Sequence, residues 1–298
     1  MPAPFYKFFA GLIALSLLLG ACASGSAGQA GGGQPGVTID NKGSDTMVNL
    51  ALAWAEEYQK QHPELRISVT GGGSGIGLAA LANQTTNIAN ASRAVKAEEK
   101  AQAVTNGFDL KEFIVARDAI GVIVNPRNPV QQLTLEQISL IYRGKINNWS
   151  ELGGENRPIV RLSRETNSGT HVYFLETVVR MGNSKDKALF SPDTLLLPSS
   201  EGIISEVSSN PNAIGYDGLG YLSAAVKTLA IAPKPGQPYV LPSAATVNDK
   251  TYSISRDLYM YTHSQPQGII LAYLDWIRSA PAQQIVTQLG FVPIVDTK

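Results

Sequence analysis

Three short loops of the sequence carry small and hydroxyl-bearing residues directly before a predicted helix. The last of them, residues 163–170, follows an apolar run that predicts a strand, and it contains Arg164 and the triplet Ser168-Gly169-Thr170. The first turn of a helix leaves backbone N–H groups without intrahelical partners, and the helix dipole adds partial positive charge there. A guanidinium group adds a planar fork of donors. This loop therefore predicts an anion site, although the same residues would also form an ordinary helix cap.

Two earlier loops share this design. One precedes an amphipathic helix with apolar positions from Met47 to Tyr58, and the other follows the glycines at 71–73 and opens a second helix. A single loop is weak evidence, because Ser and Thr cap most helices. Three of them could converge on one anion if two sheets face each other across a cleft. The residues concerned are Ser44, Asp45, Thr46, Ser74 and Gly75.

The sequence does not support nucleotide binding, serine hydrolysis or zinc binding. The glycine run at 71–75 would need a further glycine at position 76 to match a dinucleotide fingerprint or a nucleophile elbow, and that residue is Ile76. No P-loop lysine follows these loops. His62, His171 and His263 are too scattered to resemble a zinc-binding pair. We therefore expect no cofactor, no metal and no catalytic residue.

The charge balance limits the possible partners of the chain, and the amino end indicates its location in the cell. Among the 298 residues, Lys plus Arg and Asp plus Glu number 24 each, so no global field attracts nucleic acid. An apolar run from 8 to 19 leads to Leu19-Gly20-Ala21-Cys22, which resembles a bacterial lipobox. We expect residues 1–21 to be a signal peptide, Cys22 to carry lipid, and 22–36 to be a flexible tether. A plain secretory signal with an incidental cysteine stays open.

The remaining pattern predicts an α/β fold. Strand candidates at 37–39, 65–69 and 87–91 alternate with helices, which favours a mainly parallel sheet with ligands at the carboxyl ends of its strands. Further strand material at 113–125 is expected to be broken by Arg117-Asp118.

The sequence resembles the phosphate-binding lipoproteins of bacterial phosphate-specific ABC transporters. The resemblance implies a two-lobed type II periplasmic-binding-protein fold with mainly parallel sheets and a hinge between lobes, which we place at 37–155 plus 250–298 and at 156–249. It is carried by Gly43-Ser44-Asp45-Thr46, Gly71-Gly72-Gly73-Ser74-Gly75-Ile76-Gly77, Asn90-Ala91-Ser92-Arg93, Leu133-Thr134-Leu135-Glu136-Gln137-Ile138, Gly144-Lys145-Ile146-Asn147-Asn148-Trp149, Arg164 with Ser168-Gly169-Thr170, Ile214-Gly215-Tyr216, and Gly290-Phe291-Val292-Pro293.

The resemblance also implies which residues bind phosphate. Some relatives have an aspartate directly after the Ala-Ser of the third loop, where this chain has Arg93, so Asp45 is the remaining acidic candidate for accepting the proton of phosphate. The implied phosphate-binding residues are Ser44, Asp45, Thr46, Ser74, Gly75, Ser92, Arg93, Arg164, Ser168, Gly169 and Thr170.

The function predicted on these grounds is capture without catalysis. A lipid-anchored, extracytoplasmic monomer would close over inorganic phosphate and deliver it to the permease subunits of an ABC transporter. Two alternatives stay open: an enzyme that hydrolyses phosphoryl groups in the same pocket, and an oxyanion sensor or adhesin that works without a transporter.

Overall fold

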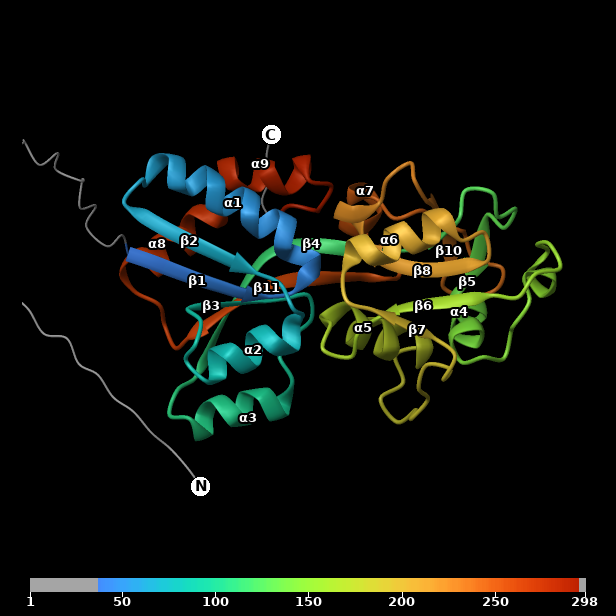
Figure 1. Ribbon diagram of the computed structural model, residues 1–298, viewed down its shortest axis with the longest axis horizontal. Helices are drawn as coiled ribbons and strands as arrows, with labels where there is room; N and C mark the ends of the chain where they lie inside the picture. Colours follow the sequence, from blue (N-terminus) through green and yellow to red (C-terminus); the bar gives the residue numbers. More distant parts are fainter. Residues whose placement is uncertain (1–36, 295–298) are drawn as a thin grey trace, which may run out of the picture. The chain divides into compact units, whose positions relative to one another are not determined.

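The computed structural model describes residues 37–294, which form a mixed α/β fold (Figure 1). The strands of its large sheet are β1 (Val37–Gly43), β2 (Leu65–Thr70), β3 (Ile88–Ala91), β4 (Leu110–Val124), β6 (Val160–Arg164), β7 (Leu195–Leu197), β8 (Ala213–Gly218), β9 (Lys227–Thr228) and β11 (Ser255–His263). A separate parallel pair is formed by β5 (Gln132–Thr134) and β10 (Ala230–Ala232). The predicted signal peptide, lipidated Cys22 and tether lie outside the described residues.

The large sheet has the strand order β2-β1-β3-β11-β4-β8-β6-β7, with β9 paired to β4. Neighbours are parallel in its outer parts, β2-β1-β3 and β8-β6-β7. The two long strands in the middle, β4 and β11, run antiparallel to each other and to the strands beside them. Two parallel regions are therefore joined through one antiparallel pair, and the carboxyl ends of β1, β3 and β6 lead into the predicted loops.

Helices cover both faces of this sheet. Figure 1 shows α1 and α9 on one face of β1–β3 and α2 and α3 on the other. The helices are α1 (Val48–Gln61), α2 (Ser74–Ala82), α3 (Ala97–Thr105), α4 (Leu135–Tyr142), α5 (Gly169–Phe174), α6 (Ser200–Ser209), α7 (Ala244–Asn248), α8 (Gly268–Ile277) and α9 (Ala280–Gln288). Short 3₁₀ turns occupy Asp45–Met47, Trp149–Leu152 and Leu219–Tyr221, and a π-helical turn, Leu175–Val179, follows α5. None of the helices within 37–294 is long and apolar enough to cross a membrane.

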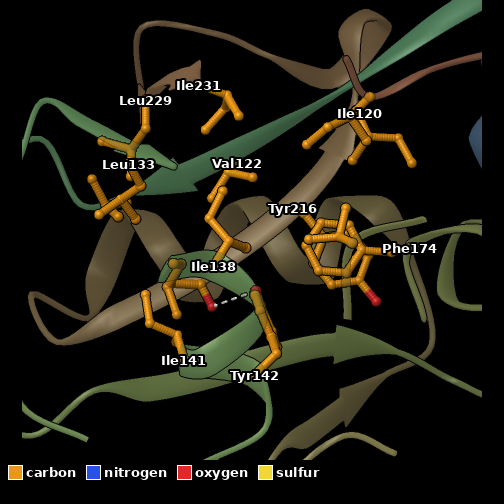
Figure 2. Close-up of a cluster of buried hydrophobic side chains, with 14 of the residues drawn as sticks. Ile120, Val122, Leu133, Ile138, Ile141, Tyr142, Phe174, Tyr216, Leu229 and Ile231 are labelled. Carbon is orange, nitrogen blue, oxygen red and sulfur yellow. Dashed lines mark hydrogen bonds between the residues drawn. The ribbon is translucent and has the colours of Figure 1, made fainter. Parts of the chain in front are cut away.

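Two large hydrophobic cores share the central strands. The first core includes Trp54, Tyr58, Phe113, Val115, Ala116, Leu258, Met260 and Leu274. The second core includes Ile120, Val122, Ile138, Tyr142, Phe174, Tyr216, Leu229 and Ile254 (Figure 2). Strand β4 contributes to both cores, and the change falls between Ala116 and Ala119. Strand β11 contributes Leu258 and Met260 to the first core, and Ile254, directly before β11, belongs to the second.

The second core fixes the helix that follows the arginine loop. The rings of Phe174, in α5, and Tyr216, in β8, are stacked with centroids 3.6 Å apart (Figure 2). The Tyr142 hydroxyl donates to the carbonyl of Leu162 in β6 at 3.1 Å. Buried aromatic pairs of this kind contribute about 0.5–1.5 kcal/mol beyond their area. The start of α5 is therefore held in place by packing at its other end.

One expectation about the sheet is wrong. Strand β4 continues through Arg117-Asp118 without a break, and Asp118 is fully buried. In the strand register Asp118 lies opposite Arg256, whose Nε and Nη2 donate to Asp118 Oδ2 at 3.2 and 2.9 Å. A charged residue is tolerated in a buried strand when a partner of opposite charge and hydrogen bonds compensate it. That partner lies 138 positions away along the chain, so no local pattern indicates it.

Candidate functional site

The predicted loops, which are far apart in the sequence, meet at one place. The hydroxyl oxygens of Thr46 and Thr170 lie 2.8 Å apart. The backbone N–H of Ser92 donates to Ser74 Oγ at 3.0 Å, and the two serine hydroxyls lie 3.4 Å apart. All four side chains are buried. Four loops thus present hydroxyl groups to a common region. Three of these loops are the ones that the sequence pattern selects, and Ser92 is added by the family resemblance.

The first residues of α5 lie against the two serines. A Cβ built on Gly169 would fall 2.3 Å from Ser74 Oγ and 2.6 Å from Ser92 Oγ, so only glycine fits there. Ser168 caps the helix, because its Oγ accepts the backbone N–H of His171. Its capping role leaves the hydroxyl proton of Ser168 available for another acceptor. The two interpretations of this loop, cap and anion site, are compatible.

Two further predicted residues have backbone roles here. Ser44 follows β1, is buried, and donates its N–H to the carbonyl of Asn90 in β3 at 3.0 Å. The N–H of Gly75 donates to the carbonyl of Asn167 at 3.0 Å, and the Asn167 side chain donates to the carbonyl of Gly72 at 3.0 Å. Asn167 therefore fastens the arginine loop to the glycine run, a role that the sequence analysis did not assign.

Arg164 belongs to the same loop as Ser168 and Thr170, and it is 1% exposed. Its Nη1 donates to Ser200 Oγ at 2.9 Å, and its Nη2 donates to Asp45 Oδ2 at 2.9 Å and to the carbonyl of Pro198 at 2.8 Å. Its Nε is buried and has no hydrogen-bond partner among residues 37–294. A buried N–H without an acceptor is costly in a folded protein. A guanidinium in this condition suits an anion that approaches from the Nε side.

Asp45 joins Arg164 to the glycine run. Its Oδ1 accepts the N–H of Gly72 at 2.9 Å, while Oδ2 accepts from Arg164. The hydroxyl of Tyr221 also donates to the backbone carbonyl of Asp45, at 2.8 Å. The side chain of Asp45 thus reaches across to two other loops and lies beside the arginine. Its role in accepting the proton of phosphate stays a prediction.

A second carboxyl group lies behind Arg164. Ser200 accepts from Arg164 and donates to Asp217 Oδ1 at 3.0 Å, which also accepts the N–H of Gly218 at 2.8 Å. Burial raises the pKa of Asp217 to about 6, against the lowering effects of the Arg164 charge and these hydrogen bonds. The charge near Arg164 therefore changes just below neutral pH. Neither Ser200 nor Asp217 carries a local sequence signal, because each acts through a residue distant in the chain.

Arg93 is the predicted residue whose contacts fit a direct role least. Its Nη1 and Nη2 donate to the two carboxylate oxygens of Glu99 at 2.8 and 2.6 Å, and Nη1 also donates to the carbonyl of Ala94. Its Nη2 lies 3.9 Å from a Cβ built on Gly75, so the side chain borders the site. Phosphate binding by Arg93 stays a prediction.

The histidine beside the site does not activate a nucleophile. His171 Nδ1 lies 2.8 Å from the carbonyl oxygen of Arg164 and 3.1 Å from Ser163 Oγ. A carbonyl only accepts, so Nδ1 carries the proton and cannot take one from Ser163. Burial lowers the pKa of His171. Within residues 37–294 no group of three or more His, Cys, Asp or Glu side chains could hold a metal ion.

Comparisons with known proteins agree with this geometry. Residues 26–281 match the family model described as a PBP superfamily domain. A relative named phosphate-binding protein PstS from Pseudomonas aeruginosa is 32% identical, over 86% of this chain and 83% of the relative. One of the same name from Bacillus subtilis is 31% identical, over 86% and 80%. The chain is also similar to a crystal structure from Clostridium perfringens, that of a phosphate ABC transporter substrate-binding protein with bound phosphate. The TM-score is 0.77 and the sequence identity 31%, and the match covers 87% of this chain and all of that one.

Proposed function

Because this chain belongs to the PBP superfamily, we propose that it is the solute-binding component of a phosphate ABC transporter. In this proposal it captures inorganic phosphate outside the cytoplasm and delivers it to a permease. The observation that carries the proposal is the meeting of four hydroxyl-bearing loops, one of which holds a buried arginine whose Nε has no acceptor among the described residues. A tetrahedral oxyanion would supply that acceptor.

Phosphate would be held by fixed donors from both parallel regions of the sheet. The hydroxyls of Thr46 and Thr170, the first turn of α5 and the Nε of Arg164 are the donors that the geometry supports best. Such donors replace the hydration shell of the anion when the site closes. Contacts of Thr46 with Thr170 and of Asp45 with Arg164 would break if the loops separated, so we propose that they form as the protein closes over its ligand.

Selectivity would come from Asp45. Phosphate near neutral pH keeps a proton that sulfate lacks. A carboxylate can therefore accept a hydrogen bond from the phosphate O–H group, whereas it repels sulfate. Asp45 is the acidic side chain in contact with Arg164, whereas the position after Ser92 holds Arg93. We therefore expect Asp45→Asn to lower the ratio of phosphate to sulfate affinity.

The lobe division is also a proposal. The boundaries expected from sequence, 37–155 plus 250–298 and 156–249, assign all of β4 to one lobe. The two hydrophobic cores favour one boundary inside β4, between Ala116 and Ala119, and one at the start of β11, between Ile254 and Leu258. These strands would then be the crossovers about which the lobes move.

Attachment to a membrane through lipid on Cys22 belongs to the same proposal. It rests on Leu19-Gly20-Ala21-Cys22 alone. Expression of the full chain in a bacterial host, with Cys22→Ser as the control, tests it. The unchanged protein should fractionate with membranes, and the variant should be released.

The experiment that tests the central proposal is calorimetric titration of the purified protein with phosphate, arsenate, sulfate and molybdate side by side. Phosphate should bind, and Arg164→Ala should weaken phosphate binding by at least ~2 kcal/mol, because a charge-assisted contact is lost. Absence of phosphate binding by the unchanged protein would refute the proposed function. Turnover of a chromogenic phosphate ester would instead favour a hydrolase.

A further inference from the structure

A second arginine reaches the proposed site from the central strands. Arg256 lies in β11 and its side chain is 2% exposed. Its Nε and Nη2 donate to Asp118 in β4, and its Nη2 also donates to Thr170 Oγ1 at 3.0 Å. Thr170 in turn lies 2.8 Å from Thr46. Arg256 thus contacts one predicted phosphate-binding loop directly and a second one through Thr170. It lies outside every motif that the sequence analysis selected.

The donors of Arg256 are not all used. Its Nη1 is buried without a hydrogen-bond partner in the part of the chain that the structure describes. The nearby aromatic ring of Tyr173, with its centroid 5.7 Å from the guanidinium carbon, contacts the cation but accepts no conventional hydrogen bond. Arg164 shows the same feature at Nε. Arg256 thus contacts Thr170 directly, Arg164 belongs to the same loop as Thr170, and each guanidinium has one buried nitrogen without a partner among the described residues.

A purely structural ion pair explains this arrangement poorly. Asp118 already accepts from Arg256 through Oδ2 and from the N–H of Leu219 through Oδ1. Burial raises the pKa of Asp118 in spite of the opposing effect of Arg256, so the pair is costly to keep in the interior. If Arg256 only paired with Asp118, neither its contact with Thr170 nor its buried Nη1 without a partner among residues 37–294 would be needed for that ion pair.

We propose that Arg256 is a second anion-binding arginine, which contacts the phosphate bound by Thr170 and ties it to the β4–β11 strand pair. This inference rests on the proposed function. Arg164 and Arg256 are each paired with a carboxylate, Asp45 and Asp118, so Arg256 would add a hydrogen-bond donor to the site and no net charge. Because β4 contributes to both hydrophobic cores and β11 pairs with it, ligand contact at Arg256 would also reach the strands about which the lobes are proposed to move.

The test compares Arg256→Gln with Asp118→Asn by calorimetric titration with phosphate. Both substitutions disrupt the same ion pair, but only Arg256→Gln removes the guanidinium group that is proposed to contact phosphate. Arg256→Gln should weaken phosphate binding about tenfold or more, since a hydrogen bond to a charged group is lost. Asp118→Asn should leave the affinity unchanged or raise it, because it removes a negative charge beside the anion and keeps an oxygen for Arg256. Equal weakening by both variants would overturn the inference and leave a structural pair.

Three further measurements keep the result interpretable. Thermal unfolding of each variant separates lost affinity from lost folding, and Arg256→Lys serves as a milder change if the glutamine variant does not fold. Arg117→Gln, one residue before Asp118 in β4, should bind like the unchanged protein and excludes a general effect of net charge. A crystal structure of the phosphate complex should place a phosphate oxygen within hydrogen-bond distance of Arg256. If Arg164→Ala abolishes binding while Arg256→Gln does not, the inference fails and the proposed function stands.

Discussion

The two ends of strand β6 each hold a buried arginine, and the two arginines differ in how their donors are used. Arg161 is 2% exposed, and each of its side-chain nitrogens has a partner: the carbonyls of Ile141 and Ile146, Asn147 Oδ1, and Asp193 Oδ2. Arg164, three residues later, is 1% exposed and has a buried Nε without an acceptor within 37–294. Burial and residue type are the same, yet only one donor set is complete.

The difference separates a structural arginine from a binding one. Arg161 satisfies main-chain carbonyls at the amino end of the strand, where no ligand is expected in a parallel sheet. Arg164 lies at the carboxyl end, among hydroxyl groups of several loops. The companion carboxyl groups differ as well, because the side chain of Asp193 is 62% exposed whereas Asp217 is fully buried. The predictions below test this contrast.

The largest expected effect is on stability at the amino end. Arg161→Met keeps most of the side-chain volume but leaves the carbonyls of Ile141 and Ile146 without their donor. Each buried polar group left unsatisfied costs about 1–3 kcal/mol, so the free energy of unfolding should fall by about 3–4 kcal/mol. Urea denaturation measures this loss. Phosphate affinity, measured under native conditions, should change little, and a large loss of affinity would contradict the contrast.

The next effect concerns the carboxyl group behind Arg164. A raised pKa of about 6 for Asp217 means that the folded protein holds this proton more tightly than the unfolded chain, whose aspartate titrates near 3.8. The stabilisation is complete below about pH 4 and is lost as the pH rises through about 6, a total of about 3 kcal/mol. The unfolding free energy of the unchanged protein minus that of Asp217→Asn should therefore fall across this range. Urea denaturation of both proteins between about pH 4 and 7 measures this difference, and a difference that does not change with pH would contradict the prediction.

The matched substitution at the carboxyl end should act on binding. Arg164→Met should weaken phosphate binding by about 2 kcal/mol or more, because the charged donor is lost. Its effect on the free energy of unfolding should be smaller than that of Arg161→Met, since a buried N–H without an acceptor is removed together with the charge. Titration calorimetry and urea denaturation of the same preparations decide it. Equal losses of stability in the two variants would mean that both arginines are structural.

The sequence could predict the loops but not this contrast. The apolar spacing of α1 predicts its buried face, Leu50, Ala51, Trp54, Ala55 and Tyr58, and the structure confirms it. Hydroxyl residues before helices are the local signal that selects Thr46, Ser74 and Thr170, whereas Ser92 is selected by the family resemblance, and the four hydroxyls do meet. Arg161 and Arg164, however, lie in one short strand, and only contacts made elsewhere in the chain distinguish them.

The same limit explains what was missed. Arg256, Asp118, Ser200 and Asp217 contribute through partners that are far away in the sequence, the nearest being Ser200 and Asp217 at 17 positions. Local propensity treats Arg117-Asp118 as a strand break because it cannot include the compensating charge across β11. Long-range pairing, and not the type of residue, decides these positions.

The smallest expected effect comes from backbone shape at the binding end. Gly169→Ala would place a Cβ 2.3 Å from Ser74 Oγ, so either the serine or the start of α5 must shift. We expect phosphate affinity to fall about tenfold, equivalent to ~1.4 kcal/mol, because the hydroxyls move away from their common target. Gly202→Ala is the matched control: it also lies in the first turn of a helix, and its Cβ would meet Ser199 Oγ at 3.4 Å, an ordinary contact. If both alanine variants bind phosphate like the unchanged protein, the close approach of α5 to Ser74 does not contribute to the site.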